Sequence, residues 1–222
     1  DKFVCVLFKF YYGFSVNKET PHLIDYAIAA GKSLGTLHAL LGGMKMEYDR
    51  SRNIFTELER AMDKKDLFCS TFDGGEGFMK EIAWAINFGQ QDNLASSIIH
   101  NDYRMHNLLF KDSHSIDVIL DFDWSCFGPL IKDVALALVE WSFADGEIEP
   151  RWDIFDAFLS AYNETSPAKI SKDNALYNWI EFSCLSDTAT YFCDRIDDES
   201  KRNINKSYMY KKYKYFSGLV NN

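Results

Sequence analysis

Two short apolar runs in the middle of the chain constrain its fold more than any other feature. Residues 108–110 (Leu-Leu-Phe) and 118–120 (Val-Ile-Leu) are separated by the polar stretch 111–115 (Lys-Asp-Ser-His-Ser). Apolar runs of this length on either side of a polar turn predict a β-hairpin. A two-stranded hairpin is only marginally stable alone, so it must be embedded in a larger body.

The residues around this hairpin favour helices. Between Thr20-Pro21, which has the form of a helix start, and Gly42-Gly43, apolar residues recur at helical spacing. We expect further helices at residues 54–64 and 78–88, after Gly128-Pro129, and at 152–162, 174–195 and 203–219. The sequence therefore predicts an α+β, predominantly α-helical fold with a small embedded hairpin. The stretch 73–77 (Asp-Gly-Gly-Glu-Gly) follows no strand, so we interpret it as a flexible turn and not as a phosphate-binding loop.

Composition excludes several classes of protein. The chain has 222 residues, of which 47% are hydrophobic and 26% are charged, so disorder does not describe it. Its net charge of −9 argues against nucleic-acid binding and permits a cationic ligand. No apolar stretch is long enough to span a membrane. The five cysteines form no Cys-x-x-Cys pair, which favours free thiols in a reducing compartment. We therefore expect a cytoplasmic protein; the sequence does not indicate its oligomeric state.

The chemistry is concentrated beside the hairpin. His100, Asp102 and Asn107 form the pattern His-x-Asp-x-x-x-x-Asn, and Asp121 follows the second predicted strand. The hairpin brings Asp121 back toward the loop that holds Asp102 and Asn107. Amide and carboxylate oxygens with open positions suit Mg²⁺, which takes its other ligands from water and phosphate. A further carboxylate that does not bind the metal can accept a hydroxyl proton. The pattern therefore suits phosphoryl transfer to an alcohol.

Four stretches, in this order along the chain, carry a resemblance to a known family. They are residues 31–40 (GKSLGTLHAL), 100–107 (HNDYRMHN), 120–123 (LDFD) and 127–135 (FGPLIKDVA). Together they resemble the phosphotransferase family of aminoglycoside, choline and homoserine (type II) kinases, which has a protein-kinase-like fold. The resemblance covers roughly residues 3–195.

The resemblance implies a role for individual residues. Asp102 corresponds to the base that orients the substrate hydroxyl, His100 shapes the loop, and Arg104 is expected to contact phosphate. Asn107 and Asp121 correspond to the two protein ligands of Mg²⁺. The nucleotide base of ATP or GTP would meet the backbone of the hinge at Phe8 to Phe10 and rest on Leu109. Asp133 would be a structural carboxylate beneath the loop, whereas we expect His38 to be a packed histidine of the core.

The same resemblance predicts how the chain is divided. Residues 1–13 would be the last strand of a small N-terminal lobe and the hinge, with the strand at 3–8, and residues 14–222 would be the helical catalytic lobe. The family also has a phosphate-covering loop and a paired lysine in its small lobe. Neither pattern occurs in this sequence, so we expect the chain to be a piece of a longer protein.

Three functions are compatible with these residues. The first is an ATP- and Mg²⁺-dependent kinase that phosphorylates a hydroxyl of a small molecule such as an aminoglycoside, a choline-like amine or homoserine. The second is a catalytically silent, kinase-like binding or regulatory module, and the third is a metal-dependent hydrolase. Acidic residues between 145 and 156 can be a solvated face or can recruit a cationic substrate.

Overall fold

The molecule is built mainly from helices. The computed structural model describes residues 9–44 and 52–220, and within these ranges it has eight α-helices and two two-stranded sheets. The helices are α1 (Leu23–Leu41), α2 (Thr56–Met62), α3 (Lys65–Thr71), α4 (Gly75–Gly89), α5 (Leu130–Ser142), α6 (Trp152–Thr165), α7 (Asn174–Cys193) and α8 (Tyr208–Val220). The strands are β1 (Ser96–Ile99), β2 (Leu108–Asp112), β3 (Ser115–Ile119) and β4 (Cys126–Pro129). The predicted fold class is confirmed.

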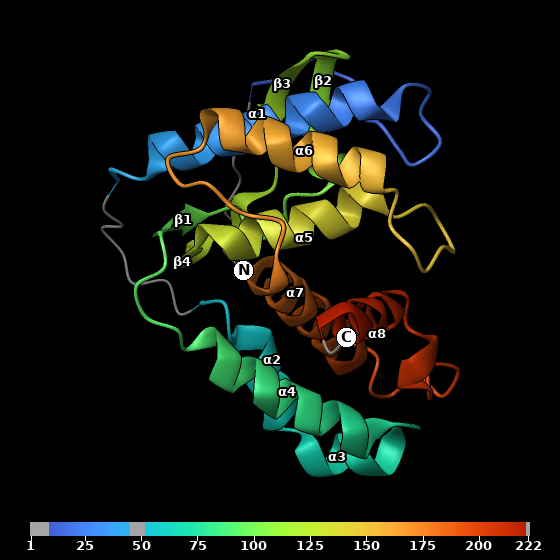
Figure 1. Ribbon diagram of the computed structural model, residues 1–222. Coiled ribbons are helices and arrows are strands. Elements are labelled where there is room, and N and C mark those ends of the chain that lie inside the picture. The colour runs from blue at the N-terminus through green and yellow to red at the C-terminus, as the bar shows by residue number, and fades with distance from the viewer. Residues whose placement is uncertain (1–8, 45–51, 221–222) are drawn as a thin grey trace, which may run out of the picture.

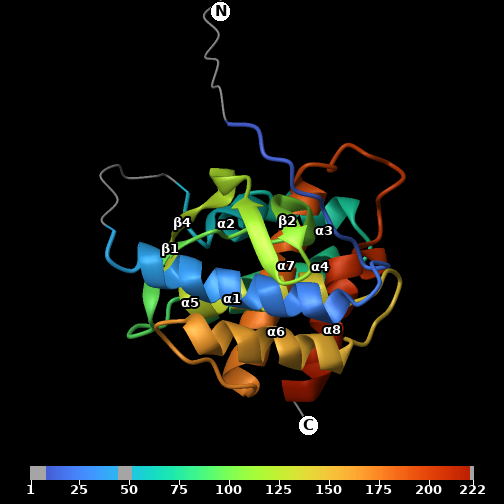
Figure 2. The ribbon, with the colours of Figure 1, turned by 90° about the horizontal axis from the view of Figure 1, so that it is seen from above.

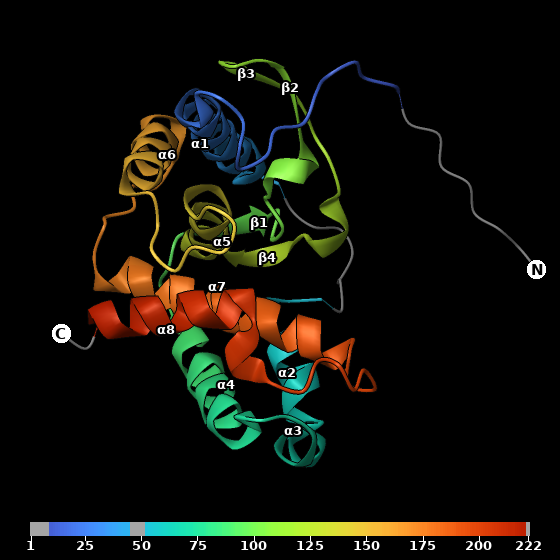
Figure 3. The same cartoon turned by 90° about the vertical axis from the view of Figure 1, so that its right-hand side faces the viewer.

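The helices form layers around α5. In Figures 1 and 3, α1 and α6 lie side by side on one face of α5, and α7 and α8 cross its other face. Helices α2, α3 and α4 form a third group on the far side of α7. Six consecutive residues of α5, from Val134 to Val139, are buried. A helix that is apolar on all sides must lie inside the protein, which explains why α5 is central.

Two glycines let α1 and α6 approach each other closely. A Cβ atom added at Gly31 would lie 2.4 Å from the carbonyl oxygen of Phe158, and one added at Gly35 would lie 2.6 Å from that of Tyr162. Any larger side chain would push the two helices apart. Both glycines belong to the stretch 31–40 that carries the family resemblance, so part of that stretch serves helix packing.

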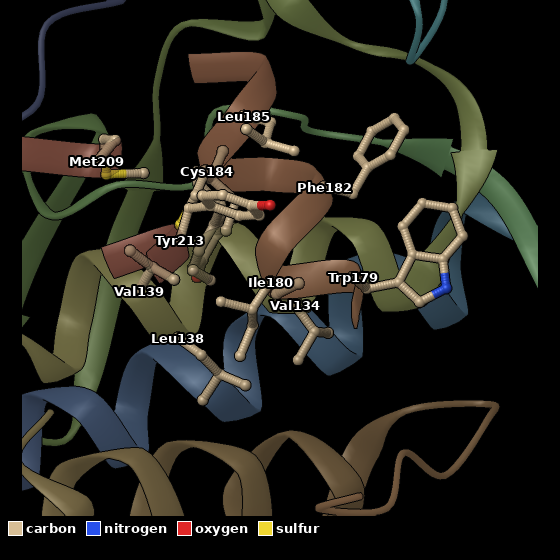
Figure 4. Close-up of a cluster of buried hydrophobic side chains, with 14 of the residues drawn as sticks. Val134, Leu138, Val139, Trp179, Ile180, Phe182, Cys184, Leu185, Met209 and Tyr213 are labelled. Atoms are coloured by element: carbon tan, nitrogen blue, oxygen red, sulfur yellow. The ribbon is translucent and has the colours of Figure 1, made fainter. Parts of the chain in front are cut away.

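Large side chains fill the space between α5, α7 and α8. Figure 4 shows Val134 and Leu138 of α5 in one cluster with Trp179 and Ile180 of α7 and Tyr213 of α8. These side chains are at most 6% exposed. Dense packing of these large side chains holds the site helices in fixed positions.

The predicted hairpin is confirmed as β2 and β3, which pair antiparallel with Leu108 opposite Ile119. The chain before α1 joins the same ribbon, because Phe14 and Phe110 exchange backbone hydrogen bonds of 3.0 and 2.8 Å. Figure 2 shows this segment running alongside β2. The second sheet, in which β1 pairs antiparallel with β4, is a pairing that the sequence did not predict.

Several predicted boundaries are wrong. Helix α1 begins at Leu23, because Pro21 lies in a turn and His22 has a positive φ of 55°. Only Asp73 and Gly74 of the stretch 73–77 precede α4; the other three residues form its first turn. Helix α3 was not predicted at all. The strand expected at residues 3–8 lies outside the described residues. Among the described helices, none has an apolar stretch long enough to cross a membrane.

Candidate active site

The hairpin brings the two expected metal ligands together. Asn107 immediately precedes β2, and Asp121 follows β3 after one residue. The backbone N–H of Leu120 donates to the carbonyl oxygen of Asn107 at 2.8 Å, which continues the ladder by one step beyond the paired strands. Asn107 and Asp121 therefore lie at the same end of the ribbon.

His100 links the loop that carries Asp102 to the segment that carries Asp121. Its Nε2 lies 2.8 Å from the carbonyl oxygen of Leu120, to which it must donate, and its Nδ1 accepts the backbone N–H of Asp102 at 3.3 Å. The ring is fully buried. This pair of contacts requires the neutral tautomer with the proton on Nε2. His100 thus fixes the relative position of two chemically important segments.

Asp133 holds the loop from the side of α5. Its two carboxylate oxygens accept the backbone N–H groups of His100 and Asn101, each at 2.8 Å. His38 of α1 reaches the same carboxylate with Nε2 at 3.0 Å and contacts Tyr162 of α6 with Nδ1. Burial opposes the charge of Asp133, but the hydrogen bond from His38 and the nearby Lys132 keep its pKa below its usual value. Three helices are therefore joined to the loop at one buried anion.

The carboxylate of Asp102 is fixed on both sides. Its Oδ1 pairs with Nε of Arg104, and its Oδ2 accepts from Nδ2 of Asn107 at 2.9 Å. The side chain of Asp102 is 16% exposed, so it is reachable from solvent. Each oxygen of an ionised carboxylate has two lone-pair sites, and one on each oxygen is left for a ligand. Asp102 can therefore accept one further hydrogen bond at each oxygen without moving.

Arg104 lies among three carboxylates. Besides Asp102 it pairs with Asp187 of α7, and its remaining nitrogen lies 3.5 Å from Glu140 of α5. Burial disfavours the charge of Arg104, but Asp187, Glu140 and Asp102 outweigh that cost and raise its pKa. Because a guanidinium has five N–H donors, donors beyond these three contacts remain. The expected contact of Arg104 with phosphate stays a prediction.

Two residues at the site have a strained backbone. Asn101 and Asp121 have φ values of +65° and +60°, in the left-handed region that side chains disfavour. Asn101 is held there by its amide, which donates to the carbonyl oxygen of Trp124 at 3.0 Å and accepts from the Lys132 ammonium. Strained residues of this kind cluster where a protein positions reacting groups.

The donor set at the end of the ribbon fits Mg²⁺. Nδ2 of Asn107 donates to both the carbonyl and the carboxylate of Asp102, so the side-chain oxygen of Asn107 must face the opposite direction. Asp121 is exposed, and its carboxylate accepts the N–H of Asp123 at 3.4 Å. The end of the ribbon thus carries two hard oxygen donors, one on the buried Asn107 next to Asp102 and one on the exposed Asp121. In the part of the chain that the structure describes, no three His, Cys, Asp or Glu side chains form a cluster that could hold a metal ion.

Two cavities open on either side of Arg104 and Asp187, which line both. The smaller one, of about 250 Å³, is bounded by Asp102, by Lys132 and by the start of α2. The larger one, of about 650 Å³, is bounded by Glu140, by Tyr208 and by the segment before α8. A small molecule in the smaller cavity would lie against Asp102, whereas the larger cavity reaches the site only through Arg104 and Asp187.

The residues expected to contact the nucleotide base lie on β2 and on the N-terminal segment beside it. Leu109 is half-buried in β2, and a Cβ added at Gly13 would lie 2.7 Å from its Cβ, so the N-terminal segment runs against this residue. Phe10 is 74% exposed. Phe8 lies outside the described residues. Of the proposed hinge at Phe8 to Phe10, the structure therefore describes only residues 9 and 10.

The structure adds residues that the sequence did not identify. Glu140 and Asp187 pair with Arg104, and Lys132 donates to Asn101 beneath the loop. Lys132 could have been noticed as a charged residue in a helix that is otherwise mostly apolar. The same signal applies to Glu140 on that helix, whereas Asp187 carries none, because α7 brings it to the site from a distant position in the sequence.

Comparison with known proteins identifies the class that this fold and site define. The model of the phosphotransferase enzyme family matches residues 14–168, which is more than half of the chain. The protein belongs to the phosphotransferase enzyme family. No curated protein sequence matches the chain.

Solved structures agree on the fold. A Ralstonia eutropha protein described as an aminoglycoside phosphotransferase superimposes with a TM-score of 0.68 at 18% identity, covering 95% of this chain and 72% of the other. Choline kinase from Cryptosporidium parvum gives a TM-score of 0.64 at 13% identity, covering 94% and 68%. Amicoumacin kinase, in a complex with AMP-PNP and Ca²⁺, gives 0.62 at 14% identity, covering 91% and 66%. These likenesses show that the chain has a kinase-like fold.

Proposed function

We propose that the protein transfers the γ-phosphoryl group of a nucleoside triphosphate, ATP or GTP, to a hydroxyl group of a small molecule. The observation that carries this proposal is the convergence of Asp102, Asn107 and Asp121 at one end of the β2–β3 ribbon. Membership of the phosphotransferase enzyme family supports the reaction class.

Asp102 would receive the substrate hydroxyl. The hydroxyl oxygen forms a bond to the γ-phosphorus while the bond from that phosphorus to the bridging oxygen breaks, leaving the nucleoside diphosphate. The hydroxyl proton passes to the carboxylate of Asp102. Because Asn107 and Arg104 fix both oxygens of this carboxylate, its open lone pairs have a set direction. Positioning of this kind is the main contribution an enzyme makes to phosphoryl transfer.

Asn107 and Asp121 would hold Mg²⁺ through one oxygen each. When bound, Mg²⁺ supplies positive charge that bridges the phosphate oxygens and stabilises the charge that develops during transfer. The structural reason to choose these residues is the fixed amide of Asn107, whose side-chain oxygen cannot turn away while Nδ2 is bound to Asp102.

The nucleotide base would lie against Leu109, near Phe10 and the preceding residues of the hinge. We propose residues 1–13 as the end of a small lobe with the hinge, and residues 14–222 as the large lobe. Support comes from the backbone pairing of Phe14 with Phe110, which places the N-terminal segment directly beside the residue proposed as the floor of the base. A cationic substrate would find carboxylates in the larger cavity, at Glu140 and Asp187.

Metal-dependent nucleotide binding tests the assignment of Asp121. In the protein encoded by the complete reading frame, calorimetry with AMP-PNP in the presence and absence of Mg²⁺ should show tighter binding with the metal. Asp121→Asn should weaken the Mg²⁺-dependent part at least about tenfold, since the anionic ligand is lost. Asp117→Asn, which alters an exposed carboxylate on β3 of the same ribbon, should have no effect. Equal Mg²⁺ dependence in the two variants would contradict the proposed metal site.

A further inference from the structure

The smaller cavity has an unusual cation in its wall. Lys132 of α5 is 4% exposed and lines this cavity together with Asp102. Its ammonium donates to the side-chain oxygen of Asn101. An ammonium has three donors, and within the described residues Lys132 has neither a second side-chain hydrogen bond nor an ion pair. Buried lysines are normally paired with a carboxylate, so this one has donors left for a ligand.

The acidic residues of the same cavity are already engaged in ion pairs. Glu57 is held by Arg52 at 3.1 Å and by Arg60 at 3.2 Å. Asp102 and Asp187 are both paired with Arg104. Each carboxylate that lines the cavity is therefore in an ion pair, with Asp102 and Asp187 sharing Arg104, whereas Lys132 forms no ion pair within the described residues.

The remaining polar groups of the cavity wall are compatible with an anion. Arg52 lies at the mouth, with its guanidinium carbon 4.0 Å above the ring of Trp124. Across the cavity, α7 presents Ser183, Ser186 and Thr190, whose side chains carry hydroxyl groups and no negative charge. Burial lowers the pKa of Lys132, and Asp133 and Asp102 partly oppose this. An incoming anion would offset that cost of burial.

We infer that the smaller cavity binds a carboxylate group of the substrate, held by the ammonium of Lys132 and by Arg52, so that the substrate is a hydroxy acid. This inference rests on the proposed function only for the placement of the hydroxyl at Asp102. Binding of the carboxylate does not require phosphoryl transfer. Lys132 is then the residue that sets substrate specificity, and its position beneath Asn101 couples recognition to the loop that carries Asp102.

Three matched probes test this inference without any nucleotide. The probes are 4-hydroxybutanoate, 4-amino-1-butanol and 1,4-butanediol, which share a terminal hydroxyl and differ in the charge at the other end. Calorimetric titration at constant ionic strength removes differences due to screening. We expect the hydroxy acid to bind about tenfold more tightly than the other two, as a charge-assisted hydrogen bond provides. Tighter binding of the amino alcohol would overturn the inference.

Two variants assign the preference to the cavity. Lys132→Met should remove the tenfold preference, while Lys80→Met, which alters an exposed lysine on α4, should keep it. Ser186→Asp places a carboxylate in the wall at a half-buried position and should also remove the preference. Circular dichroism melting establishes that each variant folds; if Lys132→Met does not, Ser186→Asp decides. A folded variant at either position that keeps the full preference would overturn the inference. Because no nucleotide is present, failure of phosphoryl transfer would leave this result unchanged.

Discussion

At the scale of single residues, Lys212 shows what a buried charge costs this molecule. Its side chain is fully buried, and its ammonium has no hydrogen-bond partner among the described residues. It lies 3.5 Å above the ring of Tyr208. Burial lowers the pKa of Lys212 to about 7, with Glu140 and Asp187 raising it and Lys18 lowering it.

This lowered pKa sets a pH dependence whose sign can be worked out. Between pH 7 and the ordinary value of 10.5, the unfolded chain binds a proton at Lys212 that the folded protein does not. Stability must therefore rise with pH across this window and be lowest, as far as Lys212 is concerned, at pH 7 and below. Lys212→Met removes that dependence. The gain in unfolding free energy on substitution should be larger at pH 7 than at pH 10, by about 3 kcal/mol.

Urea denaturation of both proteins at the two pH values measures this difference. Every other titrating group is common to both proteins, so its effect cancels. An equal effect of the substitution at pH 7 and pH 10 would contradict the lowered pKa of Lys212.

The catalytic and metal-binding residues that sequence reasoning proposed share one property, which is closeness along the chain. Asp102 and Asn107 lie in one loop, and Asp121 is returned to it by a hairpin whose turn is visible in the sequence. Asp187 could not be found in this way. Asp187 lies 83 positions after Arg104 in the sequence, and the two side chains pair only because α7 packs against α5. Motifs report local geometry, whereas ion pairs between helices depend on the tertiary fold.

At the scale of secondary-structure elements, the close approach of α1 and α6 can be tested with two glycines. Gly31→Ala should destabilise the protein by about 2 kcal/mol, because the added Cβ would lie 2.4 Å from the backbone of α6. Gly77→Ala in the first turn of α4 is the matched control, since a Cβ there meets nothing within 4 Å. That control should be neutral or stabilising by up to about 1 kcal/mol, because alanine restricts the unfolded chain. Thermal unfolding distinguishes the two; equal stability of both variants would contradict the packing described for Gly31.

Elements with a long, regular pattern or a clear turn between them were found from the sequence, whereas short elements without such a signal were missed. Helix α1 extends over 19 residues, and its apolar period was clear from the sequence. Helix α3 has seven residues, which is too short for such a period to stand out, and Phe68 alone is buried on it. Strand β4 contains Gly128 and Pro129, which favour a turn in isolation. Its pairing with β1 is a tertiary contact that overrides this local preference.

At the scale of the whole molecule, the chain has the fold of much of each similar structure. It covers 72% of the Ralstonia eutropha protein and 68% of the Cryptosporidium parvum choline kinase. In the described part of the N-terminal segment, Phe10 and Tyr12 are 74% and 92% exposed. Under the proposed division into lobes, these rings lie in the hinge, where a small lobe would cover them.

The account as a whole depends on phosphoryl transfer at Asp102. The most direct measurement follows radiolabel from γ-labelled ATP with Mg²⁺ into hydroxyl compounds of the three charge classes, using the protein encoded by the complete reading frame. The account predicts transfer by the unaltered protein and by Asp153→Asn, which changes a carboxylate that is 61% exposed on α6. Asp102→Asn should reduce the rate at least about a thousandfold, while AMP-PNP binding stays within a factor of about two, since Asp102 does not hold the nucleotide. Transfer by Asp102→Asn at the rate of the unaltered protein would contradict the central claim, and so would an absence of transfer to every class of hydroxyl compound.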